Sequence, residues 1–247
     1  MLKPIFEFDY WGLPVYAIMA ALGLLFAALS LSGKQAGINC TALVKRRVDI
    51  SVWTGFAAGL ACANVANWFL FPGMLKLALL QRIEQGGFSF YYGMLGFFCV
   101  SALLLRACRL DWKFWADQLV PSVLILHAFG RIGCSLSGCC YGAPVELFGV
   151  SFDFPARELE AACLFCLYFL FEKKIRGHRF FWYLLCYSTL RFLLEFGRGD
   201  DRGVFLIEWL SPAQVTSVLI WAGLAVFMVF HRLLGNRTFP ANYQSRN

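Results

Sequence analysis

Long apolar runs, separated by short polar and basic segments, account for most of this chain. The runs predict seven membrane-spanning helices, at about residues 13–32, 52–71, 88–105, 114–129, 158–171, 180–196 and 212–230. Their lengths approach the roughly 20 residues that a helix needs to cross a bilayer. We therefore expect an all-α, polytopic membrane bundle in which residues 1–247 form one transmembrane domain.

Composition supports a membrane protein and argues against a soluble one. The 247 residues are 60% hydrophobic and 15% charged, whereas soluble domains average about 45–50% apolar and about 25% charged residues. The net charge of +7 could suggest nucleic acid, but the basic residues lie between apolar runs and form no patch. We expect the lipid bilayer as a partner and no nucleic acid.

The distribution of basic residues predicts an orientation. About two thirds of the 22 lysines and arginines fall in alternate loops, at residues 34–47, 106–113, 173–179 and 232–246. Loops rich in lysine and arginine stay in the cytoplasm. We expect the carboxyl terminus in the cytoplasm and the amino terminus outside.

The segment His127–Gly142, HAFGRIGCSLSGCCYG, places a charged Arg131 among small residues. A guanidinium at membrane depth is costly and usually marks an anionic ligand or a substrate path. Glycines in such a segment let the backbone come close to a ligand or another helix. His127 lies one helical turn before Arg131, and a lone histidine in an apolar segment is more often structural.

Three of the ten cysteines lie in this polar setting, and most of the others lie in apolar runs. The three are Cys134, Cys139 and Cys140. A zinc site that combines them with His127 is an alternative, but the spacing matches no standard zinc finger. We expect no metal and no cofactor, and the spacing leaves open whether the loop cysteines form a disulfide.

The sixth apolar run contains a second group of polar residues, in YSTLRFLLEFGRGD. Tyr187, Arg191, Glu195 and Arg198 follow at spacings of four, four and three, which places them on one helical face. One interpretation is a salt bridge between Arg191 and Glu195 that only fixes helix packing. The other interpretation counts Arg131 together with Arg191 and Arg198. Glu195 can neutralise only one of these three arginines, so the remaining positive charge could hold a phosphate group.

Two further segments carry candidate residues. Residues 86–93, GGFSFYYG, open the third run, and glycines there would expose backbone N–H groups to an anion. Tyr91 and Tyr92 could equally be interfacial aromatic residues. In residues 155–160, PARELE, Glu158 suits a helix start, whereas Glu160 lies unusually within an apolar run.

Together these motifs resemble the prolipoprotein diacylglyceryl transferase family. GRIGCSLSGCCYG is similar to the family's GRxGNFxNGExYG, and GGFSFYYGMLG to its GGMSFHGGLLG. PARELE is similar to PSQLYE, YSTLRFLLEFGR to YGxxRFxxExxR, and Gln214 with Ser217 to the late QxxS. The motifs occur in order along nearly the whole chain, which makes the resemblance more specific than a single match.

The resemblance implies an enzyme of the bacterial cytoplasmic membrane. It would transfer the diacylglyceryl group of phosphatidylglycerol to the lipobox cysteine of a preprolipoprotein signal peptide, without a cofactor. By the same resemblance, the expected catalytic residues are Arg131, Arg191, Tyr91 and Glu195. The expected substrate-binding residues are Arg131, Arg198, Glu160, Gly138, Tyr187, Gln214 and His127.

The chain departs from the family pattern at four positions, and one of them is Asn64, where the family has an arginine near the end of the second span. Tyr91 stands where the family has a histidine that is a candidate for activating the acceptor thiol, and a tyrosine is a poor base unless strongly perturbed. Cys134 replaces an asparagine and Cys139 a glutamate. A homologue that uses another acceptor, or a non-enzymatic binder of anionic lipid, is the alternative. A transporter is disfavoured because the sequence shows no internal repeat.

Overall fold

A computed structural model describes residues 12–70, 89–147, 149–175, 177–199 and 209–234. Within these ranges the chain forms helices and one two-stranded antiparallel sheet. The helices are α1 (Gly12–Gly37), α2 (Ala42–Leu70), α4 (Phe90–Ala107), α5 (Trp112–Leu136), α6 (Ala156–Lys173), α7 (Arg179–Glu195) and α8 (Pro212–Leu234). The strands are β1 (Pro144–Leu147) and β2 (Val150–Asp153).

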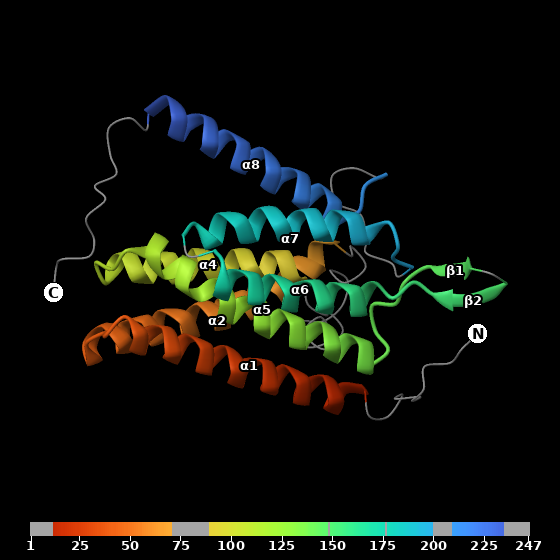
Figure 1. Ribbon diagram of the computed structural model, residues 1–247, viewed down its shortest axis with the longest axis horizontal. Helices are drawn as coiled ribbons and strands as arrows, with labels where there is room; N and C mark the ends of the chain where they lie inside the picture. Colours follow the sequence, from red (N-terminus) through yellow and green to blue (C-terminus); the bar gives the residue numbers. More distant parts are fainter. Residues whose placement is uncertain (1–11, 71–88, 148, 176, 200–208, 235–247) are drawn as a thin grey trace.

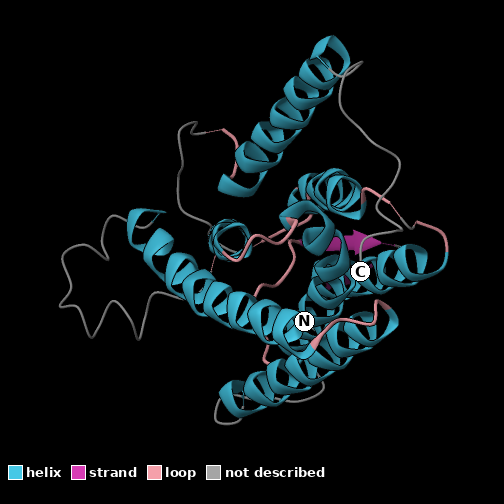
Figure 2. Ribbon diagram, turned by 90° about the vertical axis from the view of Figure 1, so that its left-hand side faces the viewer, coloured by secondary structure: helices cyan, strands magenta, loops and turns pink. Residues whose placement is uncertain are grey.

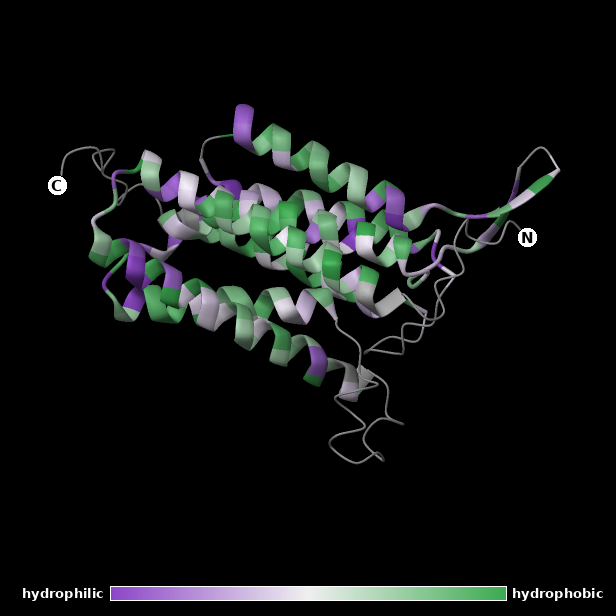
Figure 3. Ribbon diagram, turned by 90° about the horizontal axis from the view of Figure 1, so that it is seen from below, coloured by the Kyte–Doolittle hydropathy of each residue, from purple (hydrophilic) through white to green (hydrophobic). Residues whose placement is uncertain are grey.

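The helices form the all-α membrane bundle that the sequence predicts. Five of them, α1, α2, α4, α5 and α8, are long and apolar enough to cross a membrane. Hydrophobic residues cover most of their length (Figure 3), and many large apolar side chains of α8 face outward. The helices α6 and α7 occupy the expected fifth and sixth spans but are not among these five. Five of the 18 residues of α6 are charged, and α7 is only 17 residues long.

Neighbouring helices of the bundle run side by side (Figure 1). The helix α5 packs against α1 and α6, α2 packs against α4, and α7 packs against α8. The helices α1 and α8 lie at opposite edges of the bundle (Figures 1 and 2). The buried core between α5, α6 and α7 includes Leu124, Leu164, Phe171 and Tyr183. This packing holds the ends of α5, α6 and α7 close together.

The contact between α2 and α4 depends on small residues. A Cβ atom on Gly59 would lie only 2.8 Å from the carbonyl oxygen of Gly93, and one on Gly96 would lie 2.7 Å from Sγ of Cys62. Without side chains at these positions the two backbones approach closely, which stabilises helix pairs in membranes.

Several helices are longer than the apolar runs indicate, and the differences are largest for α2 and α5. The helix α5 begins at Trp112, after Asp111 accepts hydrogen bonds from the backbone N–H groups of Lys113 and Phe114, and it continues to Leu136. The expectation that the fourth helix ends near residue 129 was therefore wrong, and Arg131 is helical. The helix α2 likewise starts at Ala42, because exposed charged residues can occupy its first turns without disturbing the apolar part.

The segment after α5 contains a β-hairpin, which the hydrophobic pattern of the sequence did not predict. The register pairs Pro144 with Asp153 and Leu147 with Val150, and the hairpin projects beyond the helices (Figure 1). At its base, Gly142 forms a β-bridge with Arg198, and a Cβ atom on Gly199 would lie 2.7 Å from the Gly142 carbonyl oxygen. The bridge ties the segment after α5 to the segment after α7.

Candidate functional site

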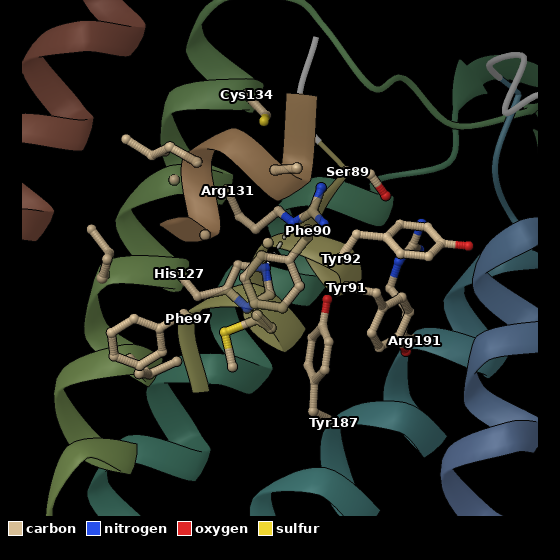
Figure 4. Close-up of a pocket in the computed structure, with 18 of the residues that line it drawn as sticks. Ser89, Phe90, Tyr91, Tyr92, Phe97, His127, Arg131, Cys134, Tyr187 and Arg191 are labelled. Atoms are coloured by element: carbon tan, nitrogen blue, oxygen red, sulfur yellow. Dashed lines mark hydrogen bonds between the residues drawn. The ribbon is translucent and has the colours of Figure 1, made fainter. Parts of the chain in front are cut away.

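A cavity of about 460 Å³ opens at the end of the bundle where α4 and α8 begin and α5 and α7 end. Most of its lining is apolar, but Arg131 comes from α5 and Arg191 from α7 (Figure 4). Glu195, also from α7, lines the cavity as well. The two arginines that the sequence predicted to act together therefore line the same cavity. Apolar walls with a few convergent charged groups are typical of a ligand site.

Arg131 is held by Glu160, a carboxylate with no exposed surface. Nε of Arg131 lies 3.1 Å from Oε1 of Glu160, and the hydroxyl of Tyr187 donates a hydrogen bond of 3.0 Å to the same oxygen. A buried carboxylate is tolerated when it is paired and hydrogen-bonded in this way. Glu160 does not line the cavity, so it contacts Arg131 from the protein interior.

His127 supports Arg131 from the preceding helical turn. Its Nε2 atom accepts a hydrogen bond of 3.4 Å from Nε of Arg131 and lies 3.7 Å from Oε1 of Glu160. Because Nε2 accepts, the imidazole is neutral in this arrangement. The ring stacks on Phe90, with 3.6 Å between centroids. Nothing in the sequence distinguished Phe90 from the aromatic residues beside it.

Arg191 and Glu195 form a buried ion pair on α7, with Nη2 of Arg191 2.6 Å from Oε2 of Glu195. Both side chains are only 4% exposed, and Nη1 of Arg191 has no hydrogen-bond partner among the described residues. Of the four residues predicted to share a helical face, Tyr187, Arg191 and Glu195 lie on α7 and are buried, whereas Arg198 lies beyond the end of this helix. Each arginine of the cavity has its own carboxylate, so the excess of positive charge is smaller than the sequence analysis expected.

Tyr91 enters the cavity from the first turn of α4, and its hydroxyl lies 2.9 Å from Oγ of Ser217 on α8. The Ser217 hydroxyl donates its proton to the carbonyl oxygen of Ala213, at 2.8 Å. The Tyr91 hydroxyl is therefore the donor to Ser217. This arrangement fixes the ring across the cavity and leaves the phenol protonated.

Besides Glu160, three residues expected to bind substrate lie outside the described cavity lining. Gln214 forms a reciprocal cap at the start of α8, because its Oε1 accepts from the backbone N–H of Ser211 while its own N–H donates to Oγ of Ser211. Gly138 lies in the turn after α5 with φ +73°, and Arg198 lies in the bridge to Gly142. Their roles in binding remain predictions. The predicted anion-binding Gly86 and Gly87 lie outside the described residues.

The three cysteines of the predicted segment come together beside Arg131. Sγ atoms of Cys134, Cys139 and Cys140 all lie within 4.8 Å of one another, and all three are free thiols. Cys134 and Cys140 also line the cavity. Hydrogen bonds from the other two thiols, and then the charges of Arg131 and Arg198, lower the pKa of Cys140. The alternative zinc site with His127 is not assembled, because His127 lies outside this cluster.

Comparisons with known proteins agree with the predicted resemblance. The profile of the prolipoprotein diacylglyceryl transferase family matches residues 4–230. The chain is 29% identical over 260 residues to phosphatidylglycerol–prolipoprotein diacylglyceryl transferase 2 of Clostridium perfringens, covering 93% of this chain and 96% of the relative. It is 29% identical to the phosphatidylglycerol–prolipoprotein diacylglyceryl transferase of Clostridium tetani, with 92% and 98% covered, and 28% identical to that of Pasteurella multocida, with 94% and 93% covered. The chain thus belongs to the prolipoprotein diacylglyceryl transferase family.

Proposed function

We propose that this protein transfers the diacylglyceryl group of phosphatidylglycerol to the lipobox cysteine of preprolipoproteins. One observation carries the proposal: Arg131 and Arg191, on different helices, line one cavity whose other walls are largely apolar. An anionic lipid needs both features, because guanidinium groups bind a phosphate through paired donors and apolar walls accept its chains.

The arginines suit a displacement at the glycerol carbon that bears the phosphate. The acceptor sulfur forms a bond to that carbon while the C–O bond breaks, and glycerol 1-phosphate leaves with the bonding electrons. Negative charge on the phosphate increases as the bond breaks, so fixed cationic donors stabilise the transition state more than the bound lipid. The product is a thioether.

Two nitrogens of Arg131 are available for this task. The interactions of its side chain with described residues use Nε, which leaves Nη1 and Nη2 to face a ligand. Glu160 and Tyr187 fix the orientation of Arg131, and Glu195 fixes that of Arg191. We assign binding of the phosphate to the two arginines and positioning to these three partners, and we place His127 with the positioning residues.

The orientation of the site follows from the basic residues. The end of the bundle opposite the cavity carries most of the described lysines and arginines, such as Lys45, Arg46, Arg106 and Lys173. From the positive-inside rule we infer that this end faces the cytoplasm and that the cavity opens at the outer face of the bacterial cytoplasmic membrane. All seven helices, α6 and α7 included, then span the bilayer in alternating directions.

The proposal is tested with the purified full chain, phosphatidylglycerol and a synthetic lipobox peptide. We expect release of glycerol phosphate together with a gain in peptide mass equal to one diacylglyceryl group. A peptide with serine in place of the lipobox cysteine, and a zwitterionic lipid as donor, serve as controls. Binding of phosphatidylglycerol without release, under conditions where the Clostridium perfringens relative turns over, would instead indicate a lipid-binding protein.

A further inference from the structure

The cluster of Cys134, Cys139 and Cys140 has no part in the function proposed above. From their geometry we infer that the three thiolates bind one zinc ion at the rim of the cavity and leave its fourth coordination position open toward the cavity. The acceptor thiol of the peptide would occupy that position. This second part depends on the proposed function, whereas the metal site itself does not.

The spacing of the sulfur atoms suits one ion. With Zn–S bonds of about 2.3 Å and tetrahedral angles, ligand sulfurs lie about 3.8 Å apart. The three Sγ atoms lie within 4.8 Å of one another as free thiols, so binding requires only small movements of the side chains. Thiolates prefer zinc or copper(I) over the harder magnesium and calcium ions.

Neighbouring residues hold the cluster and balance its charge. Nη1 of Arg157 donates a hydrogen bond of 3.0 Å to the carbonyl oxygen of Cys139, and Oγ of Ser137 lies 3.4 Å from its sulfur. Three thiolates on a divalent ion leave one negative charge. Arg131 and Arg198 both act electrostatically on Cys140, and their positive charges oppose that excess.

The fourth position has no protein ligand among the described residues. His127, the nearest histidine in the sequence, is not part of the cluster. Its Nε2 atom instead accepts a hydrogen bond from Arg131. Two of the cysteines, Cys134 and Cys140, line the same cavity as Arg131 and Arg191. A ligand that enters the cavity therefore reaches the open side of the ion. Zinc sites with three protein ligands and an open position are typical of catalysis.

A zinc ion would supply what the cavity otherwise lacks for the transfer. The hydroxyl of Tyr91 donates to Ser217 and Nε2 of His127 accepts from Arg131, so neither is placed to take the proton of the acceptor thiol. Coordination to zinc deprotonates a thiol directly. The thiol loses its proton to water and forms a Zn–S bond, and the sulfur then attacks the glycerol carbon. The thioether that forms is a weaker ligand and leaves.

The metal site is tested by binding, independently of transfer. The reduced full chain, purified in detergent, is loaded with zinc or with cobalt(II), which reports thiolate ligands by an intense near-ultraviolet charge-transfer band. We expect one ion per chain with this band, lost in Cys134→Ser and Cys139→Ser and retained in Cys166→Ser, a control on the exposed side of α6. No charge-transfer band, equal binding by the double variant of Cys134 and Cys139, or a disulfide between these cysteines in metal-replete protein would overturn the site.

The role of the open position is tested with the lipobox peptide. We expect the peptide, but not its serine analogue, to alter the cobalt spectrum, and we expect chelation of zinc to reduce the transfer rate at least tenfold until zinc is restored. An unchanged spectrum, or equal transfer by metal-free protein, would overturn coordination of the acceptor thiol. A cobalt spectrum that responds to the peptide without any release of glycerol phosphate would support the metal site and refute the proposed function.

Discussion

Replacing Arg131 by lysine keeps its positive charge and removes its geometry. The guanidinium bonds Glu160 through Nε while its two terminal nitrogens remain for the phosphate. A lysine has a single ammonium group at the end of a flexible chain, and that group cannot reproduce two parallel donors while it also pairs with the buried carboxylate. Arg131→Lys therefore separates charge from bidentate binding.

The expected loss follows from the number of hydrogen bonds. Each hydrogen bond to a charged group is worth about 1.5–3 kcal/mol, so two of them amount to roughly 3–6 kcal/mol in the transition state. At about 1.4 kcal/mol per factor of ten, kcat/KM should fall roughly 10²- to 10⁴-fold. Because the ammonium can still neutralise Glu160, the melting temperature should change little.

The assay measures glycerol phosphate release at several concentrations of phosphatidylglycerol, with thermal melting measured on the same samples. Arg106→Lys, at the opposite end of α4, is the matched control and should retain full activity. Arg131→Ala should abolish transfer, but it also leaves Glu160 unpaired, so the lysine variant is the more informative of the two. If Arg131→Lys stays within threefold of the parent protein while folded, bidentate binding of the phosphate by Arg131 is refuted.

Three further substitutions test other residues of the site. Arg191→Lys should reduce kcat/KM about 10- to 100-fold, because one charged donor to the phosphate is lost; unchanged kinetics would remove Arg191 from the site. Tyr91→Phe loses only the bond to Ser217 and should cost less than about tenfold in kcat, so a loss above 100-fold would make the phenol a catalytic group. Glu160→Gln leaves Arg131 without its buried counter-ion and should lower stability by about 3–5 kcal/mol, seen as a lower melting temperature; an unchanged melting temperature would contradict the burial of this pair.

The membrane bundle was predictable because apolar length determines where helices cross a bilayer. The limits of the helices were less predictable, since α2 begins before its apolar run and α5 continues after its own. Charged and small residues such as Lys45 and Gly133 continue these helices through backbone hydrogen bonds, which an apolar pattern does not report. The hairpin at residues 144–153 was missed for a related reason: its strands have only four residues each, too short for an alternating pattern to be evident.

The pair of Arg191 and Glu195 was predictable from a helical period, because both residues lie on one helix. The partnership of Arg131 with Glu160 involves two helices, so no spacing along the sequence indicates it. The proximity of Cys134 to Cys139 and Cys140 depends on the turn at Gly138, so the sequence showed the thiols without showing that they converge.

The matched pairing of each cavity arginine with a carboxylate has a consequence for selectivity. With Glu160 opposite Arg131 and Glu195 opposite Arg191, these four groups together carry no net charge. Small inorganic anions would gain little by entering the cavity, because they must compete with carboxylates already in place and make no favourable contact with the apolar walls. A headgroup that arrives attached to hydrocarbon tails gains from both, so discrimination against free phosphate or sulfate rests on the tails as much as on the arginines.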